Sequence, residues 1–203
     1  ATGFCTIHLD GKKTCRSFIW DQKGANRVVI PNFFELYQNS MAFFPSSIVI
    51  PKPVLGDVGA FPVGVHYTSD IDCWVRIAIK YPIAFSPSRE VIYHQDASNR
   101  TAPTHSSLGE KPVVVTIKKA IQSGDISPGS LREEALEYVA IQQIHTAISN
   151  IMAGNKQSGR DILRSVRYTK RYKKKWLFWR FWSMFPSFVP RKLLSLKEFI
   201  RGY

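Results

Sequence analysis

The chain has 203 residues, 44% of them hydrophobic, and a formal net charge of +13. This length allows one well-packed core with a helical appendage, and the apolar content is ordinary for a soluble globular protein. Residues 160–203 hold 13 of the 28 Lys and Arg residues but only Asp161 and Glu198 as acids. The basic character therefore belongs to the tail and predicts a negatively charged partner there.

Two β-prone runs open the chain, at residues 2–9 and 13–20, and the hairpin signal Asp-Gly-Lys at 10–12 separates them. Cys5 and Cys15 could face each other across this hairpin, but we expect reduced thiols in a cytosolic chain. The three cysteines lack the spacing of a zinc site, which argues against one.

Short elements follow. We expect a helix over 31–39 that begins with a proline, a strand at 48–50, and a short helix or turn at 54–61. Ser46 and Ser47 precede the strand as loop residues with hydroxyl side chains.

An amphipathic helix is predicted after Asp70, because apolar residues recur at helical spacing at Ile71, Trp74, Val75, Ala78 and Ile79. Unpaired backbone N–H groups in its first turn favour negative charge, so we expect Asp70 to be ionised. Ser69 and Asp72 also fit a capping box, which requires no chemistry. That alternative still leaves Asp70 able to accept a proton from a substrate hydroxyl.

Two short strands are predicted next, at 83–85 and 91–93, around a turn at 86–89. His94 ends the second strand and polar residues follow it, which would suit a cleft edge with a free imidazole. A histidine with a purely structural role is the alternative.

The character of the chain changes at residues 101–111, which are rich in Ser, Thr, Pro and Gly and predict a linker or loop. Only helices are expected beyond it. They are predicted at 112–122, at 128–152, and around Ile162, Leu163 and Val166.

The tail is basic over 164–175 and aromatic over 176–185. Arg180 and Pro186 interrupt the apolar run, which is too short for the roughly 20 residues of a membrane span. The pattern is typical of a segment in the headgroup layer of an anionic bilayer, so we predict membrane contact through 166–189. Single-stranded nucleic acid is a less favoured partner, and a basic helix packed on another protein is the remaining alternative.

Three linked motifs occur at Thr68–Ala78, Lys80–Ser86 and Val91–Arg100, preceded by Val58-Gly59-Ala60-Phe61. Together they resemble the second half of a family-2 glycosyltransferase with the GT-A fold, over about residues 1–102. The family usually reads Val-Gly-Gly-Phe in the first segment and Gly-Glu-Asp-x-Asp-x-Trp in the helix motif. Thr68 and Ser69 stand here in place of the usual Gly and Glu.

The resemblance implies roles for several of these residues. Asp70 would be the catalytic base that deprotonates the acceptor hydroxyl, and His94 would be the last protein ligand of a metal ion. Taken alone, these side chains also have structural explanations, such as a core position for the tryptophan. The substrate-binding residues would be Trp74, Asp72, Ser46, Ser47 and Arg100, with Trp74 as a platform for a sugar ring.

The metal would be Mg²⁺ or Mn²⁺, which bridges the phosphates of a nucleotide-sugar donor. In the family it is held by an upstream Asp-x-Asp together with the histidine, and no Asp-x-Asp precedes Asp70 here. The chain also opens at Ala1 directly in strand-like sequence. We therefore expect a fragment that lacks the donor-binding half, with the metal bound only when that half is present.

The sequence thus predicts an α/β protein, a partial GT-A (Rossmann-like) mixed sheet with short helices followed by an all-α C-terminal extension. The expected divisions are an acceptor-side half at 1–102, a helical extension at 103–165 and a membrane-associating tail at 166–203. The predicted function is inverting, metal-dependent sugar transfer from a nucleotide-sugar donor to a lipid-linked or cell-surface glycan. The expected location is cytoplasmic, on the inner face of the cell membrane. A non-catalytic membrane-surface binding module is the alternative, and an RNA-binding protein is a weaker one.

Overall fold

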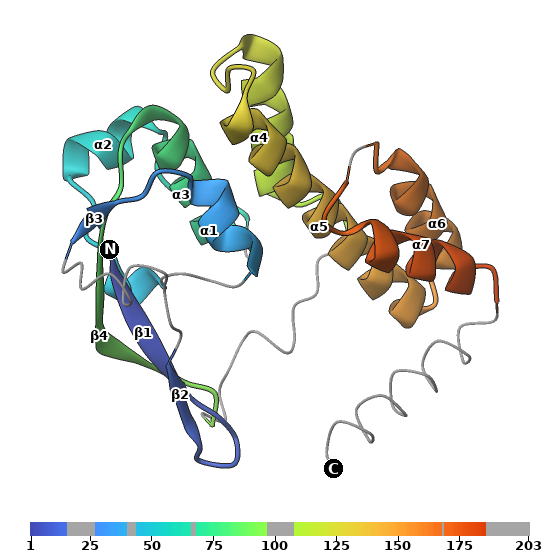
Figure 1. Cartoon of the computed structure of the whole chain (residues 1–203), viewed down its shortest axis with the longest axis horizontal. Coiled ribbons are helices and arrows are strands. Elements are labelled where there is room, and N and C mark those ends of the chain that lie inside the picture. Colours follow the sequence, from blue (N-terminus) through green and yellow to red (C-terminus); the bar gives the residue numbers. More distant parts are fainter. Residues whose placement is uncertain (16–26, 40–43, 66–67, 97–107, 168, 186–203) are drawn as a thin grey trace.

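The computed structural model has a mixed α/β architecture, with a four-stranded mixed sheet and seven α-helices in its described part (Figure 1). The structure describes residues 1–15, 27–39, 44–65, 68–96, 108–167 and 169–185.

The sheet has the strand order β2-β1-β4-β3. β1 (Thr2–Ile7) runs antiparallel to β2 (Lys13–Cys15) and parallel to β4 (Ala84–His94). β3 (Val28–Val29) pairs antiparallel with the start of β4. The predicted hairpin is therefore confirmed, although residues 16–20 of its second run lie outside the described residues.

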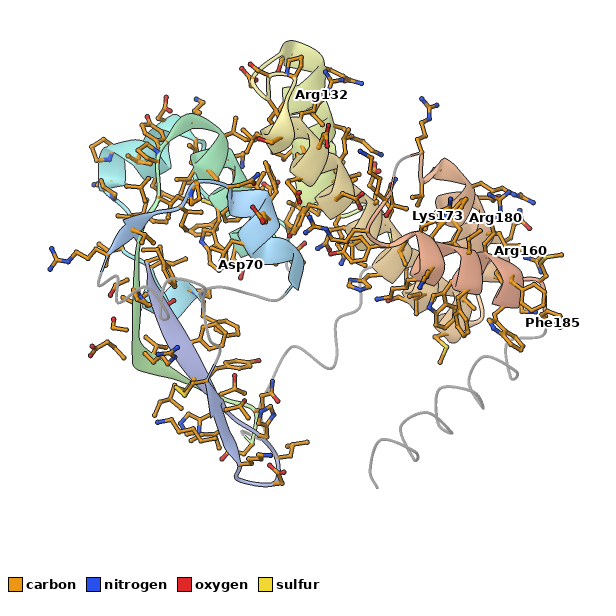
Figure 2. The ribbon with its side chains drawn as sticks, in the orientation of Figure 1. Asp70, Arg132, Arg160, Lys173, Arg180 and Phe185 are labelled. Carbon is orange, nitrogen blue, oxygen red and sulfur yellow. A yellow bond between two sulfur atoms is a disulfide. The ribbon has the colours of Figure 1, made fainter. Side chains whose placement is uncertain are left out.

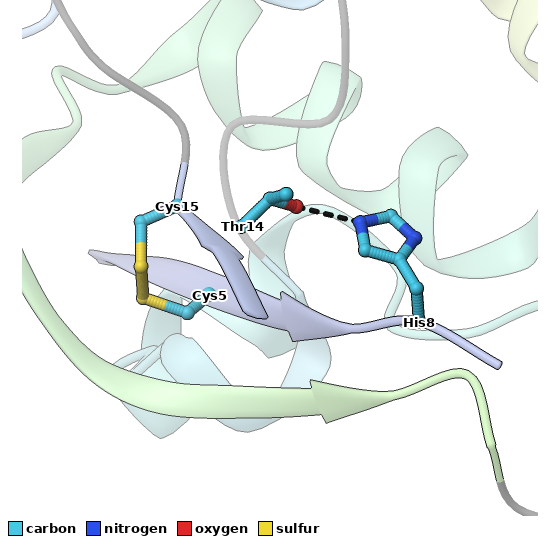
Figure 3. Close-up of a disulfide and its surroundings, with 4 residues drawn as sticks. All are labelled: Cys5, His8, Thr14 and Cys15. Carbon is cyan, nitrogen blue, oxygen red and sulfur yellow. Dashed lines mark hydrogen bonds between the residues drawn. A yellow bond between two sulfur atoms is a disulfide. The ribbon is translucent and has the colours of Figure 1, made fainter. Parts of the chain in front are cut away.

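A disulfide joins the two strands of this hairpin (Figure 3). Cys5 and Cys15 are direct partners in the strand register, and their Cα atoms are 4.2 Å apart. Our expectation of reduced thiols was wrong, because the pairing of β1 with β2 places the two side chains opposite each other. Next to the disulfide, His8 Nε2 and Thr14 Oγ1 form a hydrogen bond of 2.6 Å across the same strands (Figure 3).

β4 corrects the expected pair of short strands, because residues 84–94 form one strand instead of two around a turn. Thr2 of β1 pairs with Ser86, whereas Phe4 pairs with Val91, so the strand pairing is irregular between these points. Pro87 lies within the irregularity, where its missing N–H breaks no regular ladder bond. The predicted turn is therefore a bulge inside a longer strand.

The strand expected at 48–50 was also wrong, because these residues have no regular secondary structure. They follow a 3₁₀ turn, η1 (Pro45–Ser47), and precede Pro51 at the start of α2. Val49 is almost fully exposed. Prolines on both sides and an exposed central residue leave this segment as a connector.

Three helices pack near the sheet: α1 (Phe33–Asn39), α2 (Lys52–Asp57) and α3 (Ser69–Lys80). α3 confirms the predicted amphipathic helix and buries Cys73, Trp74, Val75 and Ile77. The capping box was wrong. The N-cap residue is Thr68, which has a left-handed φ of +60°, and its side chain makes no capping hydrogen bond.

The described residues from 108 onward contain four helices: α4 (Pro112–Ser123), α5 (Ser130–Ala153), α6 (Lys156–Ser165) and α7 (Lys173–Trp182). The first three match the predicted helices. Gly124 and Gly154 end α4 and α5 with positive φ angles, as left-handed C-terminal glycines commonly do. No described helix is long and apolar enough to cross a membrane.

α5 contributes to two hydrophobic clusters and connects the two groups of elements in Figure 1. Its first half packs Ala135, Tyr138 and Val139 with residues of α1, α3 and α4. Its second half packs Ala140, Ile144, Ala147 and Ile151 with α6 and α7. The first cluster thus crosses residue 102, and the predicted division of the chain at 102 and 165 stays a prediction.

Candidate functional site

Asp70 lies in the first turn of α3 and is half-buried. Its Oδ1 accepts a hydrogen bond of 2.8 Å from the backbone N–H of Ile71. Burial, followed by the negative charge of Asp70, raises the pKa of Tyr138 on α5. Figure 2 shows Asp70 with α1 and α3, on the other side of α5 from the labelled residues of α7. The carboxylate is therefore placed at a helix N-terminus and is partly open to solvent.

The predicted substrate contact Asp72 is a buried structural carboxylate. Its Oδ2 accepts a hydrogen bond of 3.0 Å from Arg76 Nε, and its Oδ1 accepts one of 2.6 Å from Thr116 Oγ1 on α4. Arg76 also donates to the backbone oxygens of Val58 and Ala60. The pair therefore holds α3, α4 and the turn after α2 together, which explains Asp72 without a substrate.

Two residues carry a left-handed backbone conformation that side chains rarely adopt. Among the described residues, Ala60 (φ +47°) and Thr68 (φ +60°) are the non-glycine positions with positive φ. The Thr68 hydroxyl is buried and has no hydrogen-bond partner. Thr68 lies two residues before Asp70, so this backbone strain falls next to the candidate base.

Trp74 is buried, with 3% of its surface exposed, and it forms part of the wall of a pocket of about 340 Å³. The pocket is mostly apolar and also contacts Ala1, Ile48, Val49, Ile50, Pro51, Val54, Ile77, Tyr81, Pro82, Ile83 and Ala84. The sequence suggested either a core residue or a platform for a sugar ring at Trp74. The structure is compatible with both, since the ring belongs to the core and one part of it lines a cavity.

The two predicted serine contacts lie in η1, which precedes the pocket segment, and are not among the pocket-lining residues. Ser46 is exposed, and Ser47 is buried. Ser47 Oγ accepts from the N–H of Phe44 and donates to its carbonyl oxygen, at 2.9 and 3.0 Å. Ser47 therefore closes the 3₁₀ turn. Arg100, another predicted contact, lies outside the described residues.

His94 ends β4 opposite Ile7, with an exposed ring. Its Nδ1 lies 3.1 Å from Asp96 Oδ1. Within the part of the chain that the structure describes, no group of three or more His, Cys, Asp or Glu side chains could hold a metal ion. The described residues alone therefore do not fit a metal site. The divalent metal, which was expected only with the donor-binding half, stays a prediction.

α7 and the residues just after it carry a group of neighbouring aromatic rings, most of them exposed. Phe178, Phe181 and Phe185 are 39–53% exposed, and Leu177 and Met184 extend the same surface. The ring centroids of Phe181 and Phe185 are 5.1 Å apart, and Trp182 contacts all three phenylalanines. We call these six residues the aromatic face. Figure 2 shows Lys173 and Arg180 on this helix and Phe185 just beyond its end.

Two of the tail tryptophans pack against the rest of the protein and are not part of the exposed surface. Trp179 is buried in the second hydrophobic cluster, with 5% of its surface exposed. Trp176 is half-buried, and its Nε1 donates a hydrogen bond of 2.8 Å to the Leu163 carbonyl. The exposed rings of this segment are therefore mainly phenylalanines.

A buried glutamate that the sequence analysis missed holds the start of α7. Glu137 of α5 accepts hydrogen bonds from Thr169 Oγ1 at 2.9 Å and from the backbone N–H groups of Lys170 and Arg171. At the other end, Arg160 Nε donates to the Ser183 carbonyl at 2.9 Å. The only sequence signal for Glu137 was its place beside apolar residues of the long helix, which did not reveal its partner about 33 residues away.

The chain matches no protein-family model, no curated protein and no solved structure. The likeness to family-2 glycosyltransferases therefore rests on the sequence motifs.

Proposed function

We propose that residues 1–102 form the acceptor-side part of a family-2 glycosyltransferase of the GT-A type, with Asp70 as its catalytic base. The observation that supports this most is the position of the two left-handed non-glycine residues. The family motifs have glycine at the places of Ala60 and Thr68, and both residues have positive φ here.

This coincidence carries weight because only a few per cent of non-glycine residues have positive φ, and few of those are Thr or Ala. The left-handed backbone conformation is unfavourable by about 1 kcal/mol or more for an L-residue with a side chain, whereas glycine adopts it without this penalty. The chain thus keeps a backbone geometry suited to glycine at two motif positions where the glycine has been replaced. A backbone conformation shared with the glycosyltransferase family explains both positions better than two unrelated strained turns.

In the proposed reaction, Asp70 needs only to lie close enough to the acceptor hydroxyl to accept its proton. An acceptor hydroxyl attacks the anomeric carbon of the sugar, the bond from that carbon to the diphosphate breaks, and the hydroxyl proton passes to a carboxylate oxygen of Asp70. A single in-line attack inverts the configuration, so one base suffices. The pocket beside Trp74, one helical turn after Asp70, would accept an apolar part of the acceptor.

The experiment is an assay of the protein at its natural length with a panel of nucleotide sugars and membrane lipid extracts, with release of nucleoside diphosphate as the readout. Asp70→Asn should lower turnover by about 10²- to 10⁴-fold, the usual contribution of a general base. Asp57→Asn, an exposed aspartate on α2, is the matched control and should leave turnover unchanged. Full turnover in Asp70→Asn would show that Asp70 is not the base.

We further propose that the aromatic face attaches the chain to an anionic membrane, so that a lipid-linked or surface glycan acceptor is within reach. Interfacial segments place aromatic rings at the headgroup level beside Lys and Arg, and Lys173, Lys174 and Lys175 begin this helix. Replacing Phe178, Phe181 and Phe185 with Ser should abolish sedimentation with phosphatidylglycerol vesicles. Phe61→Ser, at an exposed phenylalanine outside α7, should not change it.

The predicted cytoplasmic side of the membrane has its own test. Disulfides are rare in the reducing cytosol, whereas the structure pairs Cys5 with Cys15. Rapid alkylation of intact cells followed by mass spectrometry would find both thiols modified if the chain lies on the inner face. An unmodified, bonded pair would place this part of the chain in an oxidising compartment.

The second candidate function is a non-catalytic membrane-surface binding module. It is favoured by the aromatic face, which requires nothing of Asp70. Calorimetry with a nucleoside diphosphate and Mn²⁺ separates the two candidates, since the absence of heat from the natural-length protein would favour the module. An RNA-binding role would instead give a steep salt-dependent shift on single-stranded RNA.

A further inference from the structure

Residues 48–50 have the backbone conformation of a β-strand, but no strand of the described chain pairs with them. Ile48 has φ −123° and ψ 138°, and Pro51 has φ −59° and ψ 133°, so the backbone is extended at both ends of this segment. Among the described residues, no hydrogen bond uses a backbone N–H or C=O group of residues 48–50. The segment therefore presents a short row of extended backbone groups that another strand could bond.

The side chains of this segment alternate as they do in a strand. Ile48 and Ile50 are half-buried and pack against the first hydrophobic cluster, whereas Val49 between them is 91% exposed. All three are β-branched, which favours strand pairing, and all three border the apolar pocket beside Trp74. No charged residue lies between 44 and 51, so this edge lacks the charges with which proteins protect an unpaired strand.

The segment is complementary to a second copy of itself. Ile-Val-Ile reads the same in both directions, so an antiparallel pair centred on Val49 places each isoleucine opposite an isoleucine of the second copy. The nearest charged residue is Lys52, and this register places it opposite Ser46 of the second copy, so no like charges face each other. Because the contact is the same on both copies, one two-fold axis relates them, and each copy supplies the backbone partners of the other.

We propose that two copies of this chain pair through residues 48–50 as antiparallel β-strands, with Val49 opposite Val49 of the second copy. The pairing would remove the exposed valines from water and bring the two apolar pockets next to each other. Pro45 and Pro51 limit the length of the pair, so the contact fits a weak or transient dimer. This inference depends neither on the proposed transferase activity nor on the proposed membrane attachment.

The test measures the oligomeric state of the complete chain by sedimentation at increasing concentration, up to about 1 mM because a short contact of this kind binds weakly. The wild-type chain should form a dimer. Val49→Lys should abolish it, since two like charges would face each other across the pair, whereas Val63→Lys, at another fully exposed valine, should leave it unchanged. An equimolar mixture of Val49→Lys and Val49→Glu should form the dimer again, because opposite charges then meet in this register.

Hydrogen exchange locates the contact, and exchange over residues 48–50 should slow as the concentration of the wild-type chain rises. A monomer at every concentration would overturn the proposal, as would a dimer that Val49→Lys and Val63→Lys form equally well. Loss of the dimer when Phe178, Phe181 and Phe185 are replaced with Ser would also overturn it, by assigning self-association to the aromatic face. Slow exchange over 48–50 in a monomer would mean that a segment other than a second copy covers this edge.

Discussion

Aromatic side chains are buried around α3 in the first half of the chain, but many are exposed around α7 in the second half. Around α3, the rings of Phe34, Trp74 and Phe85 are 1–3% exposed and fill the first hydrophobic cluster. On α7 and just after it, three phenylalanines are 39–53% exposed, although the helix also buries Trp179. Apolar surface left in water is costly, and a contiguous exposed group usually marks an interaction site. The rings around α3 therefore belong to the core, whereas the phenylalanines on and just after α7 remain in contact with solvent.

Among the described residues, two carboxylates are buried, and each of them bonds to a neighbouring element. Asp72 joins α3 to α4 and, through Arg76, to the turn after α2. Glu137 joins α5 to the turn that begins α7. Removing either acid should damage its own half and spare the other, and this selectivity is the basis of the first two predictions.

The largest effect is expected for Asp72→Ala. The substitution leaves a mostly buried Arg76 without its partner and should lower the free energy of unfolding by about 3 kcal/mol. Urea denaturation measures it. Asp57→Ala is the control, because Asp57 forms an exposed ion pair with Lys80 and its loss should change stability little. Equal losses in the two variants would contradict a structural role for Asp72.

Glu137→Ala should have a smaller effect that is confined to α7. Two backbone N–H groups and one hydroxyl lose a charged acceptor, which should cost about 2 kcal/mol. Hydrogen exchange should become faster over 169–182 and stay unchanged over α3. Glu133→Ala, at an exposed ion pair with Lys170, is the matched control. Faster exchange throughout the chain would mean that α7 is not held separately.

Gly159→Ala tests the close approach of α6 to α5. A Cβ atom at Gly159 would lie 2.6 Å from Ile151 Cγ1 and 2.9 Å from the Ala147 carbonyl oxygen. We expect a loss of about 1–2 kcal/mol from overpacking. Gly56→Ala meets no atom within 4 Å and should be neutral or slightly stabilising. Thermal denaturation of both variants checks the difference, and an equal effect would contradict the close packing.

The smallest predicted effect is an increase in stability. Thr68→Gly removes the left-handed strain and the unpartnered hydroxyl before α3, and should raise stability by up to about 1 kcal/mol after the added chain entropy of glycine. Ser69→Gly, inside the helix, should instead be destabilising. A loss of stability in Thr68→Gly would show that the left-handed conformation is not under strain, and it would weaken the link with the glycine of the family motif.

Local patterns in the sequence predicted the helices well, because the apolar spacing of α3 and α5 and the glycines after α4 and α5 act over a few residues. Features that depend on distant partners were not predictable in the same way. Pro87 suggested a turn because the sequence does not show that β1 lies beside it. Asp72 was assigned to a cap and a substrate because Thr116 is 44 residues away. The tail was recognised as aromatic, but which rings α5 and α6 cover depends on packing.

The measurement that most directly tests the division between the two halves is hydrogen exchange of the complete chain with and without anionic vesicles. The account predicts slower exchange at residues 173–185 in the presence of vesicles and no change at residues 69–80 of α3. Unchanged exchange over 173–185, or protection centred on α3, would contradict the proposal that the aromatic face is the membrane-binding part of this protein.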